Sequence, residues 1–201
     1  MSNMKDALGR TIDYMRISIT DRCNLRCRYC MPYGVECVPR WDILTLEEIQ
    51  AVAICAAGLG IRHIKVTGGE PLVRRDCCQL VKQLKSTPGI EKVTITTNGV
   101  LLERYLDDLA EAGIDGINIS LDTLDRDLYQ RITGTDALGT VMESVRRASA
   151  MPISVKINAV SIDFSQMEED CGECPAGNQD GWQQMVELAR EYPVDVRFIE
   201  M

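Results

Sequence analysis

The sequence has a single histidine, no long apolar run and a deficit of positive charge. The one histidine, His63, means that a zinc site could take at most one histidine ligand. No apolar run approaches the roughly 20 residues of a membrane span, and residues 1–10 lack the apolar segment of a signal peptide, so we expect a cytoplasmic protein. Lys and Arg number 22 against 30 Asp and Glu, a net charge of −8, which argues against nucleic acid or a membrane as partner.

Cysteine, by contrast, is plentiful, with nine in 201 residues. In a chain of this size without a signal peptide, they point to metal ligation and reduced thiols. Cys23, Cys27 and Cys30 have the spacing C-x3-C-x2-C directly after a strand-like run. Three thiolates suit a 4Fe-4S cluster whose fourth iron is open to a ligand from outside the protein. The alternative, a closed structural zinc site, needs four ligands, and His63 would have to come from a different strand.

The apolar pattern predicts an α/β fold. Six short runs alternate apolar and polar residues: 15–20, 63–67, 92–96, 116–120, 153–159 and 194–200. Helical patterns lie between them, clearest at 45–59, 76–86, 101–112, 140–150 and 181–191. Thr45 and Glu48 have the spacing of a capping box at the first helix. Repeated βα units predict a parallel sheet in one domain, residues 1–201, either open and doubly wound or an incomplete barrel.

The two faces of the predicted strands differ in character. One is apolar and suited to a layer of helices, while the other is polar and carries four cations, Arg16, Lys65, Lys156 and Arg197. Unpaired buried polar groups cost about 1–3 kcal/mol each, so an interior this polar must hold water or a ligand. This favours an incomplete (βα)6 TIM-like barrel with a wet lumen, and the cations favour an anion such as a triphosphate, unless Asp195 pairs with some of them. The alternative is that the polar face is simply solvated.

The acidic segment 162–180 has no clear period and is predicted to be a loop inserted before the sixth strand, with no function assigned to its Cys171 and Cys174. Cys55 sits at an apolar position of the first helix and is expected in the core.

The motif C-x3-C-x-Tyr-C is the signature of the radical S-adenosylmethionine enzymes, which this chain resembles. Four stretches narrow the resemblance to the GTP 3',8-cyclases, the family of molybdenum cofactor biosynthesis protein A: 16–23, 67–72, 96–99 and 197–200. The resemblance runs from about Gly9 to Met201. It implies a radical SAM barrel and a lyase that converts GTP to (8S)-3',8-cyclo-7,8-dihydroguanosine 5'-triphosphate in molybdopterin cofactor biosynthesis. A 4Fe-4S cluster and S-adenosyl-L-methionine are the implied cofactors.

The resemblance also implies roles for individual residues. Cys23, Cys27 and Cys30 would hold three irons while S-adenosylmethionine chelates the fourth and is cleaved to methionine and the 5'-deoxyadenosyl radical; no side chain is assigned as catalytic. Positions that match S-adenosylmethionine contacts are Tyr29, Gly68, Gly69, Glu70 and Ser120. Positions that match GTP contacts are Arg16, Lys65, Thr96 and Lys156. The implied partner is an electron donor of the flavodoxin or ferredoxin type.

The sequence departs from the family pattern at its C-terminal side. The family carries a second 4Fe-4S cluster, bound by three cysteines in a C-terminal region, whose open iron holds the guanine base. We expect that region to be absent, since Cys171 and Cys174 precede the sixth strand rather than follow it. Three hypotheses stay open: a GTP 3',8-cyclase barrel, a radical SAM enzyme acting on another substrate, or a non-catalytic iron–sulfur module.

Overall fold

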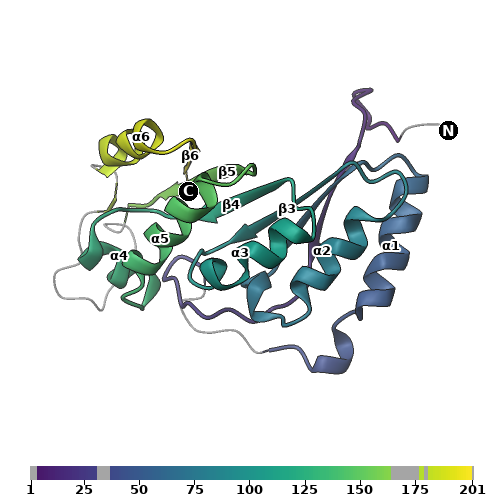
Figure 1. Cartoon of the computed structure of the whole chain (residues 1–201), viewed down its shortest axis with the longest axis horizontal. Coiled ribbons are helices and arrows are strands. Elements are labelled where there is room, and N and C mark those ends of the chain that lie inside the picture. Colours follow the sequence, from purple (N-terminus) through teal and green to yellow (C-terminus); the bar gives the residue numbers. More distant parts are fainter. Residues whose placement is uncertain (1–3, 31–36, 164–176, 179–180, 201) are drawn as a thin grey trace. The chain divides into compact units, whose positions relative to one another are not determined.

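The structure is a computed structural model that describes residues 4–30, 37–163, 177–178 and 181–200 (Figure 1). Its six strands form one sheet in chain order: β1 (Tyr14–Ser18), β2 (His63–Thr67), β3 (Lys92–Thr97), β4 (Gly116–Ser120), β5 (Ser154–Ser161) and β6 (Asp195–Glu200). The helices alternate with them: α1 (Leu46–Gly58), α2 (Cys77–Lys85), α3 (Leu102–Glu111), α4 (Arg126–Thr133), α5 (Leu138–Ser149) and α6 (Trp182–Glu191). Two 3-10 turns are η1 (Arg40–Asp42) and η2 (Pro71–Val73). The predicted α/β fold with parallel strands is confirmed.

Contacts divide the chain into two compact units. The first unit contains Met1–Asn24, Val35–Thr97 and Arg104–Ile117, and the second contains Leu25–Gly34, Asn98–Glu103 and Asn118–Met201. Among the described residues, no helix is both long and apolar enough to cross a membrane.

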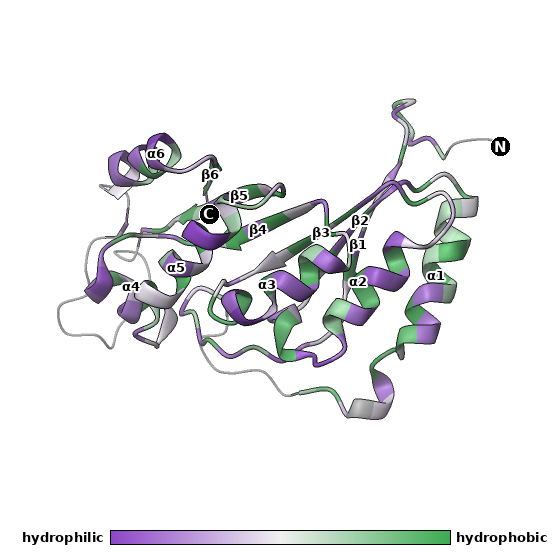
Figure 2. Cartoon of the chain, in the orientation of Figure 1, coloured by the Kyte–Doolittle hydropathy of each residue, from purple (hydrophilic) through white to green (hydrophobic). Residues whose placement is uncertain are grey.

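In the first unit, β1, β2 and β3 pair in parallel, and α1 and α2 lie side by side along them (Figure 1). The sheet alternates as predicted, because Ile64, Val66, Val93 and Ile95 are buried while the residues between them are at least partly exposed. Figure 2 shows both apolar and polar residues along α2, as a helix with one buried and one exposed face requires. The predicted capping box is present: Thr45 N donates to Glu48 at 2.8 Å and Glu48 N donates to the Thr45 hydroxyl at 3.2 Å.

The second unit contains a helix that the sequence patterns did not predict. α4 is eight residues long, too short for an apolar period to stand out, but both of its ends carry ordinary signals. Asp125 caps its N-terminus by accepting a hydrogen bond from Leu128 N at 2.7 Å, and Gly134 ends it in the left-handed region at φ 75°. In the same unit α5 contacts β5, α6 contacts β6, and β5 pairs with β6 in parallel.

The expectation that Cys55 lies in the core is wrong. Cys55 is exposed, and its neighbour Ile54 is 53% exposed, while Ala53 and Ala56 face the core. α1 is apolar on nearly every side after its acidic first turn, so the position of an apolar residue does not reveal which face is buried.

Candidate functional site

The three motif cysteines belong to both units. Cys23 is half-buried in the first unit, and in the second unit Cys27 is half-buried and Cys30 is exposed. None of the seven described cysteines is disulfide-bonded, and no group of three metal-ligating side chains is assembled among the residues that the structure describes. Reduced thiols are the donors that an iron–sulfur cluster takes, so the chemistry of these residues fits the implied group. Cys171 and Cys174 lie outside the described residues.

The turn that carries Cys27 and Cys30 is anchored on the end of α4. Cys30 N donates to Cys27 O at 3.0 Å, which closes the turn itself. Arg28 N donates to Ile132 O at 3.0 Å, and Arg26 N donates to the next carbonyl along α4 at the same distance. These carbonyls belong to the last turn of the helix, where no partner within the helix is available. The helix that the sequence patterns missed therefore holds two predicted cluster ligands in place.

In the first unit, the segment before Cys23 packs against Gly68 and Gly69. Gly69 N donates to Thr20 O at 2.8 Å. A Cβ atom at Gly68 would lie 2.6 Å from Thr20 O, and one at Gly69 would lie 2.5 Å from Arg22 O. No real side chain tolerates such contacts, so glycine is required here for close approach of two backbone segments. The two glycines fix the backbone that leads into Cys23, the first predicted cluster ligand.

Glu70 follows these glycines and is fully buried. Its Oε1 accepts hydrogen bonds from Leu72 N at 3.1 Å and from the Thr97 hydroxyl at 2.8 Å. Burial of a carboxylate is costly unless it is hydrogen-bonded, and these contacts stabilise it. Glu70 thus has a role within the fold of the first unit, and its contact with S-adenosylmethionine stays a prediction.

The predicted cations of the first unit lie in one row across the sheet. Arg16 on β1 is in register with Lys65 on β2, and Lys65 is in register with Thr94 on β3. Tyr14 connects the two cations, because Arg16 Nε donates to its hydroxyl at 3.1 Å and Lys65 Nζ lies 6.0 Å from its ring centroid. Neither cation forms an ion pair with any carboxylate of the described residues. Thr96 is half-buried and follows Thr94 on the same face of β3.

Lys156 in the second unit has a different environment. Its Nζ lies 2.7 Å from Asp195 on the adjacent strand β6, and the two residues are in register. The hydrogen bond from Lys156 lowers the pKa of Asp195, which keeps that carboxyl ionised. The pairing with Asp195 that the sequence left open is therefore present. Arg197 is exposed on β6, and Ser120 is half-buried at the end of β4.

Tyr29 lies between Cys27 and Cys30 and is held by Asp122, a residue that the sequence patterns did not single out. The Tyr29 hydroxyl donates to Asp122 Oδ2 at 2.9 Å. Burial, together with the charge of Asp122, raises the pKa of Tyr29 far above its usual range, so the hydroxyl stays protonated and acts as the donor. Burial also raises the pKa of Asp122, although the hydrogen bonds from Val160 and Tyr29 oppose that shift.

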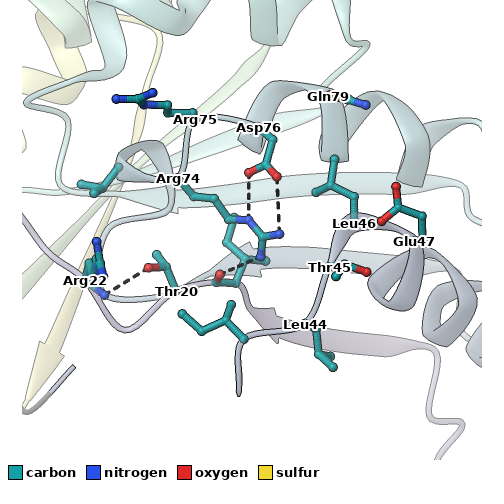
Figure 3. Close-up of a pocket in the computed structure, with 13 residues that line it drawn as sticks. Thr20, Arg22, Leu44, Thr45, Leu46, Glu47, Arg74, Arg75, Asp76 and Gln79 are labelled. Carbon is teal, nitrogen blue, oxygen red and sulfur yellow. Dashed lines mark hydrogen bonds and ion pairs between the residues drawn. The ribbon is translucent and has the colours of Figure 1, made fainter. Parts of the chain in front are cut away.

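An open pocket of about 820 Å³ lies in the first unit where β1 and β2 end (Figure 3). Figure 3 shows the guanidinium group of Arg74 facing the carboxylate of Asp76. Arg74 Nη1 donates to Ile19 O at 3.0 Å, and its Nε donates to Asp76 Oδ1 at 2.8 Å. Arg22, which directly precedes Cys23, also lines the pocket. Arg74 is thus a second support, beside the two glycines, for the backbone that leads to the cluster motif.

The chain belongs to the radical SAM superfamily, because the family model of that description matches residues 17–170. A 4Fe-4S cluster and S-adenosylmethionine are the cofactors of that superfamily. The GTP 3',8-cyclase of Moorella thermoacetica is 45% identical over 200 residues, which cover 98% of this chain and 58% of that protein. Molybdenum cofactor biosynthesis protein 1 of Drosophila melanogaster is 44% identical over 201 residues, 99% of this chain and 33% of that protein. The chain therefore spans little more than half the length of the GTP 3',8-cyclase it matches.

Solved structures agree with the fold. Streptococcus suis SuiB bound to its precursor peptide SuiA superposes with a TM-score of 0.72 at 21% identity over 94% of this chain and 39% of that one. Methylornithine synthase superposes with a TM-score of 0.68 at 18% identity over 93% of this chain and 52% of that one. At these identities, the likeness concerns the architecture of the chain and not its substrate.

Proposed function

We propose that this chain is the barrel part of a GTP 3',8-cyclase, a lyase that converts GTP to (8S)-3',8-cyclo-7,8-dihydroguanosine 5'-triphosphate in molybdenum cofactor biosynthesis. Cys23, Cys27 and Cys30 would hold the 4Fe-4S cluster. Tyr29, Ser120 and the stretch Gly68–Glu70 would bind S-adenosylmethionine. When both are bound and the cluster is reduced, they supply the radical that starts the reaction. An electron donor of the flavodoxin or ferredoxin type would deliver the electron in the cytoplasm.

The observation that carries the proposal for the substrate is the pair Arg16 and Lys65. Arg16 is exposed and Lys65 is half-buried, and neither has a carboxylate partner among the described residues. Cations without a carboxylate partner favour an anion, and a triphosphate supplies several negatively charged oxygens. Tyr14 holds the two side chains together without neutralising them. The row is therefore suited to bind the phosphates of GTP.

Lys156 would take part in a different way. Its ammonium group already has Asp195 as partner, so a phosphate would have to replace that carboxylate or share the ammonium with it. The net gain from binding a phosphate at Lys156 should then be smaller than at Arg16 or Lys65.

The test compares GTP, ATP and inorganic triphosphate by equilibrium binding to the 201-residue chain. We expect similar and weak affinities for all three, because Arg16 and Lys65 contact phosphates and not the base. Cyclisation is then assayed with the 201-residue chain, and with the same chain fused to the remainder of the Moorella relative; we expect product only from the fusion. Strong selection of GTP over ATP, or cyclisation by the 201 residues alone, would contradict the expectation that the guanine base is recognised outside these residues. Absence of triphosphate binding would favour a radical SAM enzyme with another substrate.

A further inference from the structure

Asp122 lies at the centre of a hydrogen-bond network in the second unit. Its Oδ2 accepts from the Tyr29 hydroxyl, its Oδ1 accepts from Val160 N, and both distances are 2.9 Å. Its backbone carbonyl accepts from Asn178 Nδ2 at 2.7 Å. Asp122 therefore joins the turn of the cluster motif, the end of β5 and Asn178.

Asn178 uses its whole side-chain amide in this network. Besides the bond to Asp122, its Nδ2 donates to Val160 O at 2.7 Å, and its Oδ1 accepts from Ile162 N at 2.8 Å. The residue is only 8% exposed. A buried amide with both donor hydrogens and its oxygen engaged has a single low-energy orientation. Asn178 thus fixes the backbone of Asp122 relative to β5.

Tyr29 is held at both ends as a result. Its ring packs against the apolar pair Ile132 and Ile162, and its hydroxyl is bound by Asp122. The backbone of the same turn is bound to α4 through Arg28 N. The side chain of Tyr29, directly before a predicted cluster ligand, is therefore held in one orientation by contacts within this unit.

We propose that Asp122 and Asn178 are positioning residues for the cofactor site: they hold Tyr29, and with it the turn that carries Cys27 and Cys30, in the orientation that S-adenosylmethionine requires. This inference rests on the proposed function, in which Tyr29 contacts the cofactor. Residues that hydrogen-bond to the side chains of a metal site, without contacting the metal, orient those side chains. Their removal typically changes affinity or activity by about 10–100-fold. Asp122 and Asn178 are placed to act on Tyr29 in this way.

The test uses Tyr29→Phe, Asp122→Ala, Asp122→Asn and the double variant Tyr29→Phe/Asp122→Ala in the anaerobically reconstituted protein. Iron content and S-adenosylmethionine affinity are measured separately, the latter by the change that the cofactor causes in the electron paramagnetic resonance spectrum of the reduced cluster. We expect near wild-type iron in all four. Tyr29→Phe and Asp122→Ala should each weaken cofactor binding at least about tenfold. The double variant should be no weaker than the stronger single one, since both changes break the same hydrogen bond.

Two comparisons separate positioning from simple stability. Asp122→Asn is isosteric and can still hydrogen-bond the Tyr29 hydroxyl, so it should recover most of the affinity that Asp122→Ala loses. Val145→Ala creates a cavity on the buried face of α5 in the same unit and should lower the melting temperature while leaving cofactor affinity unchanged. The inference is overturned if cluster-loaded Asp122→Ala binds S-adenosylmethionine as tightly as wild type, or if its effects add to those of Tyr29→Phe. If instead the wild-type protein holds its cluster but does not bind the cofactor, the proposed function fails and not this inference alone.

Discussion

The carboxylate of Glu70 and the hydroxyl of Thr97 form a 2.8 Å hydrogen bond within the first unit, between the N-cap residue of η2 and the residue that ends β3. Glu70 is fully buried and Thr97 is 2% exposed. The same carboxylate oxygen binds Leu72 N. The glycine-rich stretch after β2 is therefore bound to the sheet by a side chain for which the family resemblance implies a contact with the cofactor.

Replacing Glu70 separates these two roles. Glu70→Ala should lower the free energy of unfolding by about 1–3 kcal/mol, since the Thr97 hydroxyl and Leu72 N lose their acceptor. Glu70→Gln keeps an oxygen that can accept both bonds, so most of the stability should remain in urea unfolding. If the carboxylate also binds the cofactor's ammonium group, Glu70→Gln should weaken S-adenosylmethionine binding by about 1.5–3 kcal/mol in calorimetry. Thr97→Val is the matched control, expected to reduce stability but not affinity. Unchanged affinity in Glu70→Gln would leave Glu70 with its role in the fold alone.

The close approach at Gly68 and Gly69 leads to a second prediction. Gly68→Ala or Gly69→Ala would place a Cβ within 2.6 Å of the backbone before Cys23 and should destabilise the protein by about 1–3 kcal/mol. Because that backbone leads to a predicted cluster ligand, Cys23, the iron content after reconstitution should also fall. Gly139→Ala is the control: no atom lies within 4 Å of its Cβ position, and alanine favours the helix. Equal stability and iron in Gly68→Ala and Gly139→Ala would show that the segment before Cys23 adapts.

The sequence predicted most of the fold because apolar and polar residues alternate along most of the strands. The ranges 63–67 and 116–120 coincide with β2 and β4, and the capping box located the start of α1. The sequence predicted less of the site, because several contacts there join residues far apart in the chain. The bond from Tyr29 to Asp122 spans 93 positions, and no local pattern indicates it. α4 was not predicted because its eight residues are too few to show a helical apolar period, although Asp125 and Gly134 mark its ends.

Cysteine reactivity tests the packing of α1 and α2. In the protein before cluster reconstitution, Cys55 is exposed and should react readily with iodoacetamide at pH 8. Cys77 is 2% exposed, and burial raises its pKa well above the usual range. Burial, with Asp108 nearby, raises the pKa of Cys78 to about 11, so only about one thiol in a thousand is ionised at pH 8. Mass spectrometry should show that Cys77 and Cys78 are modified only slowly until urea is added. The rate of modification of Cys78 should increase as the pH rises. Protection of Cys55 equal to that of Cys77 would contradict the orientation of α1.

The cations of the sheet should differ in their contribution to triphosphate binding. Arg16→Ala and Lys65→Ala should each cost about 1.5–3 kcal/mol of binding free energy, the range for a hydrogen bond to a charged group. Lys156→Ala should cost less, because Asp195 already neutralises that side chain. All three losses should shrink as salt rises and screens the wild-type contacts. Lys92→Ala, an exposed lysine at the start of β3, is the control and should bind triphosphate normally. A loss from Lys156→Ala as large as that from Lys65→Ala would mean that the ion pair opens when the ligand binds.

The most direct test of the proposed cluster site is to measure the formation of 5'-deoxyadenosine from S-adenosylmethionine. The measurement uses the anaerobically reconstituted protein after reduction with dithionite. We expect about four irons per chain and slow but measurable cleavage without substrate. Cys23→Ala, Cys27→Ala and Cys30→Ala should each abolish cleavage and most of the iron, whereas a Cys171→Ala/Cys174→Ala variant should match the wild type. The proposed cluster site would be contradicted by a wild-type protein that carries its full complement of iron and forms no 5'-deoxyadenosine. It would also be contradicted by a Cys171→Ala/Cys174→Ala variant as inactive as the three single variants.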